Sequence, residues 1–217
     1  KKTVKAAGDY FSFDIQDGYE IFPQPIQQPH PPLYMAAGTE GSIAQAARGG
    51  FGLMQSSLPN VEVFAEHVDI YRRHMSEAPA PLNANPAFGE VDIARMVYVA
   101  PTDAMARAES EAGITRHMRS FFSGGNTGGY LGDVAEKHDD SQFAYENLVQ
   151  GTIFHGAQDT VIRQIERFQA AGATSIMLHY PPYYGQEKTL EMLRLFAKEV
   201  LPHIQALTAP KARAAAE

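Results

Sequence analysis

The chain has 217 residues, 44% hydrophobic and 20% charged, which is typical of a globular protein with one sizeable core. Its net charge of −7 argues against a nucleic-acid-binding protein, which needs a basic surface, and no apolar run approaches the roughly 18 residues of a membrane helix. The lack of cysteine excludes disulfides, thiolate metal sites and cysteine nucleophiles, and with no signal-peptide pattern at the start we expect a cytoplasmic protein.

The first 32 residues predict little regular structure. Lys1–Gly18 is interpreted as a polar lead-in, whose Tyr10, Phe11 and Phe13 are expected to pack against the outside or rim of the fold. Ile21–Pro32 contains five prolines and is therefore expected to be an extended connection.

The best-defined unit of the sequence is a strand, a glycine turn, a helix and a second strand. The apolar run Leu33–Ala37 is typical of a buried strand, and Phe51–Met54 is a second one. Between them, Gly38–Ser42 turns the chain into a short helix that ends at Gly49 and Gly50. This layout predicts two parallel strands joined by a helix.

The glycine turn has two interpretations. Backbone N–H groups and the helix dipole favour an anion such as a phosphate at this place, and Thr39 and Ser42 add hydroxyl groups. Small polar residues at a helix start also serve simply as caps, which on chemistry alone is the commoner role.

A second helix is predicted to begin at Pro59-Asn60. Its apolar stripe consists of Val61, Phe64, Val68 and Tyr71. His67 and His74 share another face, but they are seven positions apart, so a solvated face is favoured over a metal site. The loop Glu77–Glu90 then leads to a third strand at Ala94–Ala100.

Thr102 is predicted to cap the next helix, which has Asp103 in its first turn and runs toward Ser120. The segment Phe121–Asp133 holds five glycines but no Gly-Lys-Ser/Thr, so it is interpreted as a mobile lid rather than a phosphate loop. Ala135–Asp140 has no recognised spacing of metal ligands and is interpreted as a solvated charged turn.

The last predicted unit is a helix over Gly156–Gly172 and a strand at Ser175–His179. Its inward-facing residues are Val161, Ile162, Ile165 and Phe168. A final helix is predicted to end near Pro202, and Thr208–Glu217 is expected to be a loose tail. The apolar face of that helix comprises Leu190, Leu193, Phe196, Ala197 and Val200.

Four sequence segments together point to a known family. They are YFSFD at Tyr10–Asp14, IFPQPIQQPHPPLYMAAG at Ile21–Gly38, G-x-x-x-x-V-I-x-x-I-x-x-F at Gly156–Phe168 and L-x-x-F-A-x-E-V-L-P-H at Leu193–His203. In this order and spacing, the chain resembles the bacterial luciferase-like flavin monooxygenases from about Tyr10 to His203.

The resemblance implies an α/β fold, the TIM (β/α)8 barrel, in which the four predicted strands are the last four of eight. A complete barrel takes about 250 residues. We therefore expect residues 1–207 to form the C-terminal half of a single barrel domain, with a lid or insertion at about 121–155 and a tail at 208–217. Half a barrel leaves two open edges and an uncovered apolar face, so either another chain or a longer form of this one is expected to supply the N-terminal half.

The predicted strand ends hold no nucleophile–base pair and no paired carboxylates. This fits a flavin enzyme, in which the cofactor carries the chemistry. The resemblance implies a monooxygenase that uses reduced FMN, supplied by a flavin reductase, and O2 to oxidise a small organic substrate. In the family, the turn after the fifth strand contributes to the FMN phosphate site, which carries over to Gly38, Thr39 and Ser42. Luciferase has an acidic residue where this chain has Gly38, so only a backbone contact is expected there.

The family's basic phosphate partners and active-site histidine belong to the absent half, so the catalytic residues stay unknown. His179, at a predicted strand end, is a candidate for contact with substrate or flavin, and a rim histidine bonded to backbone is the alternative. Met54, Gln55, His179 and Tyr180 are candidates for the flavin or substrate pocket, with a plain core position as the alternative for Met54. No metal is expected.

Two other functions remain open. Relatives of the same fold use a deazaflavin for hydride transfer without oxygen, and others are non-catalytic barrel partners that stabilise a second subunit or hold flavin. A homo- or heterodimer is expected. The substrate is not set by these residues, since long-chain aldehydes, alkanesulfonates, terpenes and polyketides all occur within the family.

Overall fold

The computed structural model describes residues 4–16, 22–28, 30–80, 82, 84–123, 143–179 and 184–207. The chain divides into two compact units, residues 1–32 and residues 33–217. The predicted lid segment 124–133, the charged turn 135–140, Tyr180 and the tail 208–217 lie outside the described residues.

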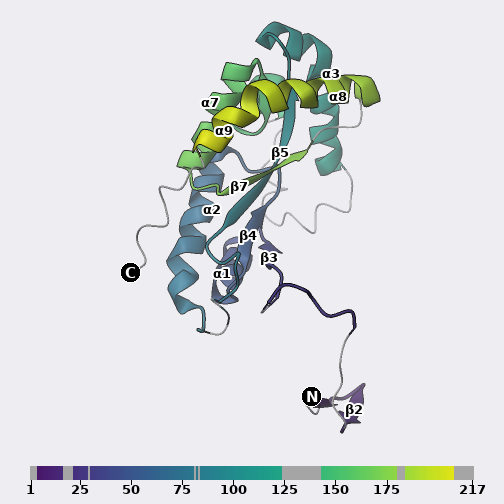
Figure 1. The fold of residues 1–217 in the computed structure, drawn as a ribbon, viewed down its shortest axis with the longest axis vertical. Helices are drawn as coiled ribbons and strands as arrows, with labels where there is room; N and C mark the ends of the chain where they lie inside the picture. Colours follow the sequence, from purple (N-terminus) through teal and green to yellow (C-terminus); the bar gives the residue numbers. More distant parts are fainter. Residues whose placement is uncertain are drawn as a thin grey trace. The chain divides into compact units, whose positions relative to one another are not determined.

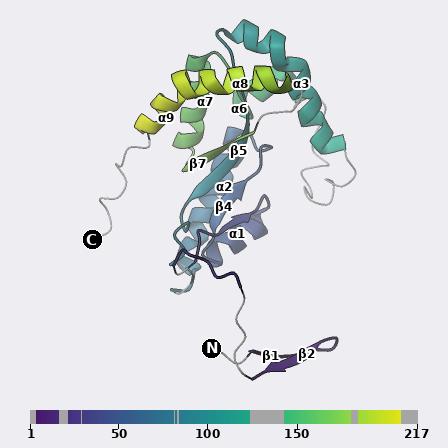
Figure 2. The same cartoon turned by 45° about the vertical axis from the view of Figure 1, so that its right-hand side comes forward.

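The first unit contains an antiparallel hairpin, which the sequence analysis missed (Figure 2). It pairs β1 (Val4–Ala7) with β2 (Ser12–Ile15), and the N–H of Gly8 donates to the carbonyl of Phe11 across the turn, at 2.9 Å. Within this unit Tyr10 and Phe11 are 91% and 83% exposed at the hairpin turn, and their packing against the barrel stays a prediction. A turn of four residues directs side chains outward, away from any strand neighbour.

The second unit alternates strands and helices (Figure 1). In chain order these are β3 (Tyr34–Ala36), α1 (Glu40–Arg48), β4 (Gly52–Gln55), α2 (Val61–His74), η1 (Met75–Glu77), β5 (Val91–Val99), α3 (Asp103–Ser123), α6 (Tyr145–Gly151), β6 (Phe154–Gly156), α7 (Gln158–Ala170), β7 (Ser175–His179), α8 (Gly185–Leu195), the π-helical turn η4 (Phe196–Val200) and α9 (Leu201–Leu207).

All strands of the second unit pair in parallel, as the alternation of strands and helices predicts. The long strand β5 lies at the centre, with β4 and β7 along its first half, and β3 lies next to β4 (Figure 1). A short strand that the sequence analysis missed, β6, pairs with the second half of β5. Its three residues are too few to show a period.

The predicted helical stripes are largely confirmed. The stripe of α2 is buried in full, and α7 buries Val161, Ile165 and Phe168, whereas Ile162 is only half-buried. The end of α1 is also confirmed, because Gly50 adopts a φ of 68°, which favours glycine. The hydroxyl of Thr102 accepts the N–H of Met105 at 3.1 Å, so its predicted capping role is correct.

The prediction that the last helix ends near Pro202 is wrong. Helix α9 continues to Leu207, because the wider π-helical turn precedes Pro202 and accommodates a residue without an N–H donor. Phe196 and Val200 are buried as predicted, but Leu190 is 41% exposed. This helical stretch packs along α7 (Figures 1 and 2).

Side chains alternate between two faces of the sheet. The helix-covered face carries Arg95, which lies over the ring of Phe168 in α7, and Gln55, which contacts α2. The opposite face carries Met54, Ala94 and Met177, which are half-buried or exposed, with Met177 at 49%. This face is therefore only partly open, because Asp92 and Met96 of β5 lie on the same side and are buried.

Candidate functional site

Parallel strands place their carboxyl ends at one edge of the sheet, where barrel enzymes have their active sites. At this edge lie the turn before α1, the loop after β4, residues 100–102 after β5, and His179 at the end of β7. The sequence-predicted site residues Gly38, Thr39 and His179 therefore belong to the same edge. These loops follow different strands and come together only in the folded sheet.

The turn before α1 forms a capping box. The N–H of Ser42 donates to Thr39 Oγ1 at 3.3 Å, and the N–H of Thr39 donates to Ser42 Oγ at 3.1 Å. Both residues are exposed. A Cβ added to Gly38 or Gly41 would meet nothing within 4 Å, so the space beside the turn is open. The turn is thus a satisfied cap that also leaves room for an anion.

Another helix start at this edge is already occupied by a carboxylate. Asp103 Oδ1 accepts the N–H of Ala157, the residue before α7, at 2.6 Å, and Oδ2 accepts the hydroxyl of Thr160 at 3.2 Å. Gly156 precedes them with a φ of 141°. The carboxylate of Asp103 therefore already places a negative charge at the start of α7, which disfavours a second anion there.

The structure separates the predicted neighbours Met54 and Gln55. Met54 lies on the open face, while Gln55 is 1% exposed on the helix-covered face. Gln55 Nε2 donates to the carbonyl of Ala37 at 2.5 Å, and Gln55 Oε1 lies 2.7 Å from His67 Nδ1. The solvated face predicted for His67 is therefore wrong: the ring is half-buried, and this burial lowers its pKa.

A buried arginine that the sequence analysis did not single out lies below the loop after β4. Arg95 is fully buried, and its guanidinium donates to the carbonyls of Ser56 and Pro59, each at 2.7 Å. It lies 4.3 Å from the centre of the Phe168 ring, and burial lowers its pKa to about 9. The only hint in the sequence is a charged residue within the apolar run ARMVYVA. Its contacts tie the loop to the central strand.

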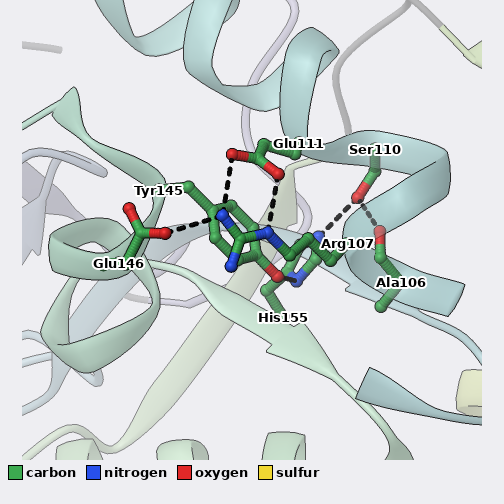
Figure 3. Close-up of polar contacts among 7 residues, drawn as sticks. All are labelled: Ala106, Arg107, Ser110, Glu111, Tyr145, Glu146 and His155. Carbon is green, nitrogen blue, oxygen red and sulfur yellow. Dashed lines mark hydrogen bonds and ion pairs between the residues drawn. The ribbon is translucent and has the colours of Figure 1, made fainter. Parts of the chain in front are cut away.

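A second buried polar group lies between β6, α3 and α6 (Figure 3). Ser110 donates its hydroxyl proton to the carbonyl of Ala106 at 2.7 Å and contacts His155 Nε2, while Tyr145 Oη lies 2.9 Å from His155 Nδ1. Because Ser110 donates elsewhere, His155 donates from Nε2 and accepts the Tyr145 hydroxyl at Nδ1. This closed chain leaves no nucleophile, since Ser110 is 1% exposed. Arg107 lies over the Tyr145 ring at 4.7 Å.

His179 packs edge-to-face against His117 of α3, with ring centres 5.3 Å apart. His179 is half-buried, and the pKa of His117 is lowered by burial and then by the neighbouring His179. The described residues bring together no group of three metal-ligating side chains. The described residues of this edge offer hydroxyls, backbone amides and imidazoles.

The parallel sheet, its outer helices and its open face define the chain as part of a (β/α)8 barrel. The model of the luciferase-like monooxygenase family matches residues 1–175. The chain therefore belongs to the luciferase-like monooxygenase family.

Solved structures share the fold. Monooxygenase RslO1 from Streptomyces bottropensis is 24% identical with a TM-score of 0.65, over 94% of this chain and 56% of that one. The oxygenating constituent of 3,6-diketocamphane monooxygenase from the CAM plasmid of Pseudomonas putida, in complex with FMN, is 19% identical with a TM-score of 0.64. The match covers 93% of this chain and 58% of that one. An F420-dependent secondary alcohol dehydrogenase is 19% identical with a TM-score of 0.61, over 94% and 56%.

The chain thus spans little more than half the length of these structures. No curated protein matches it significantly. Among the described helices, none has both the length and the apolar character needed to cross a bilayer.

Proposed function

We propose that this chain is the C-terminal half of a flavin-dependent monooxygenase, which uses reduced FMN and O2 to oxidise a small organic substrate. The observation that carries the proposal is the open glycine turn before α1, at the carboxyl edge of the sheet in a luciferase-like monooxygenase chain. The FMN in the diketocamphane monooxygenase structure supports this choice of cofactor. When bound, the reduced flavin supplies the oxygen-activating chemistry, and the protein binds and orients it.

The turn is proposed to hold the flavin phosphate through the backbone around Gly38-Thr39 and through the hydroxyls of Thr39 and Ser42. The hydroxyl of Ser42 donates to the carbonyl of Thr39 at 3.0 Å and lies 2.9 Å from Thr39 Oγ1, so a phosphate is proposed to take a hydroxyl proton from one of these contacts within the cap. Glu40 places a carboxylate in the same first turn, so the turn offers neutral donors rather than positive charge. Basic partners of the phosphate are proposed to come from the complementary half of the barrel.

Binding of FMN and riboflavin to the complete barrel tests this site, because riboflavin lacks the phosphate. A hydrogen bond to a charged group contributes ~1.5–3 kcal/mol, so Thr39→Ala or Ser42→Ala should weaken FMN binding roughly tenfold to a hundredfold and leave riboflavin unchanged. Thr102→Ala removes the cap of α3 and is the matched control, with no selective loss of FMN. Equal losses for FMN and riboflavin would mean that the turn only supports the fold.

A deazaflavin-dependent hydride transfer is the second candidate, supported by the fold shared with the F420-dependent alcohol dehydrogenase. Oxygen uptake separates the two. The proposed monooxygenase consumes O2 with reduced FMN, while a deazaflavin enzyme turns over without O2. A third candidate is a non-catalytic partner subunit, for which the assembled barrel would bind flavin and show no turnover.

The proposed partners follow from the open face. Met54, Ala94 and Met177 leave apolar surface that the N-terminal half-barrel, in the same or another chain, is proposed to cover. A flavin reductase is proposed to supply the reduced FMN, and the assembled enzyme is proposed to be a homo- or heterodimer. Mixing the chain with the N-terminal half and measuring turnover tests this arrangement, and the two halves should be active only together.

A further inference from the structure

The buried amide of Gln55 connects the proposed phosphate turn to helix α2. Gln55 is the last residue of β4, and its side chain reaches the carbonyl of Ala37, one residue before Gly38, at 2.5 Å. Its other end lies 2.7 Å from Nδ1 of His67, in the middle of α2. With 1% of its surface exposed, Gln55 has no competing water for these two bonds.

The chemistry of these contacts determines which atoms donate. A carbonyl oxygen only accepts, so the NH2 group of Gln55 faces Ala37 and its amide oxygen faces His67. His67 must then donate from Nδ1. Burial lowers the pKa of His67, which favours the neutral ring, and the Gln55 oxygen selects the tautomer with its proton on Nδ1. The three residues therefore form a directed chain from His67 through Gln55 to Ala37.

This chain sets the orientation of the peptide between Ala37 and Gly38. In a planar trans peptide, the C=O and the following N–H point in opposite directions. Because Gln55 holds the carbonyl of Ala37 inward, the N–H of Gly38 points away from Gln55. A Cβ added to Gly38 would meet nothing within 4 Å, so an anion has space beside this amide.

We propose that Gln55 and His67 are positioning residues for the flavin phosphate: they hold the Ala37–Gly38 peptide so that the Gly38 amide is presented to the ligand. This inference rests on the proposed phosphate site at the turn. Neither side chain contacts the ligand, and the effect is transmitted through the peptide plane alone. Without this anchor, the Ala37–Gly38 peptide can rotate, and the amide loses its preset direction.

The test compares FMN with riboflavin on the complete barrel that contains this chain. Gln55→Met keeps the length of the side chain and removes both bonds, so FMN affinity should fall about tenfold, the worth of one hydrogen bond to a charged group, while riboflavin affinity stays unchanged. His67→Phe should act in the same direction. His67→Asn retains an N–H donor near the position of Nδ1 and should restore FMN binding.

Gln164→Met is the matched control, because Gln164 also bonds backbone groups, at His155 of β6 and Val149 of α6. It should leave the preference for FMN over riboflavin intact. The positioning role would be overturned if folded Gln55→Met protein kept its preference for FMN over riboflavin. It would also be overturned if Gln164→Met reduced that preference as much as Gln55→Met does. If the unmodified protein binds FMN and riboflavin equally, the phosphate site itself fails, and this inference fails with it.

Discussion

Acidification should destabilise the chain through His155. Burial lowers the pKa of His155 to about 4, against an ordinary value of 6.5, although the nearby Asp103 carboxylate opposes this effect. The neutral ring accepts the hydroxyl of Tyr145 at Nδ1 and donates from Nε2 to Ser110 (Figure 3). A second proton would convert the accepting nitrogen into a donor and place a charge in a site that is 2% exposed.

The sign of this pH dependence follows from the number of protons that His155 binds in the folded and the unfolded chain. Between pH 6.5 and pH 4, the unfolded chain binds a proton at His155 that the folded chain does not, so the free energy of unfolding falls as the pH falls. Above pH 6.5, both states are neutral and the contribution is constant. The difference between the two pKa values corresponds to about 3 kcal/mol across this window.

Urea unfolding of the full chain, followed by circular dichroism because the sequence has no tryptophan, measures this dependence. The His155→Gln variant should be less stable at pH 7, because it disrupts the buried network, and should lose most of the extra destabilisation between pH 6.5 and pH 4. His30→Gln, outside this network, should keep the dependence of the unmodified chain. If the His155→Gln variant kept the pH dependence of the unmodified chain, the acid destabilisation would not come from His155.

Three further substitutions should change stability. Asn85→Ala should lower the free energy of unfolding by about 3 kcal/mol without changing flavin affinity, because the buried Asn85 amide bonds four backbone groups at the amino ends of the strands, away from the site edge. Gly156→Ala should destabilise strongly, because its Cβ would lie 2.4 Å from a carboxylate oxygen at a φ of 141°, whereas Gly41→Ala, in open space within α1, should stabilise by about 0.5–1 kcal/mol. Urea titrations at pH 7 check all three, and a Gly156→Ala variant as stable as the unmodified chain would contradict the predicted strain.

Local signals in the sequence were sufficient for much of the fold. Apolar spacing located α2 and α7, glycine marked the end of α1, and the hydroxyl at Thr102 marked the start of α3. Each of these depends on residues within about one helical turn, and the parallel pairing then follows from the strand–helix alternation.

The hairpin of β1 and β2 is local, but its strands show no clear alternation of apolar and polar residues. Other features depend on residues far apart in the chain: β6 has three residues and pairs with the part of β5 that extends past β7. The sequence placed Gln55 correctly at a strand end but could not show which face of the sheet its side chain occupies. Consecutive residues of a strand face opposite sides, so a shift of one position moves a side chain from the open face to the helix-covered face.

The site shows the same division. The capping role of Thr39 and Ser42 was predicted from their place at a helix start, a relation over three residues, while their part in a phosphate site stays a proposal. Arg95 and His155 were not, because their partners lie on other elements, 39 positions away at Ser56 and 45 positions away at Ser110. A buried polar side chain is stable only where such distant groups complete its hydrogen bonds, and those groups meet only when the sheet and its helices have packed.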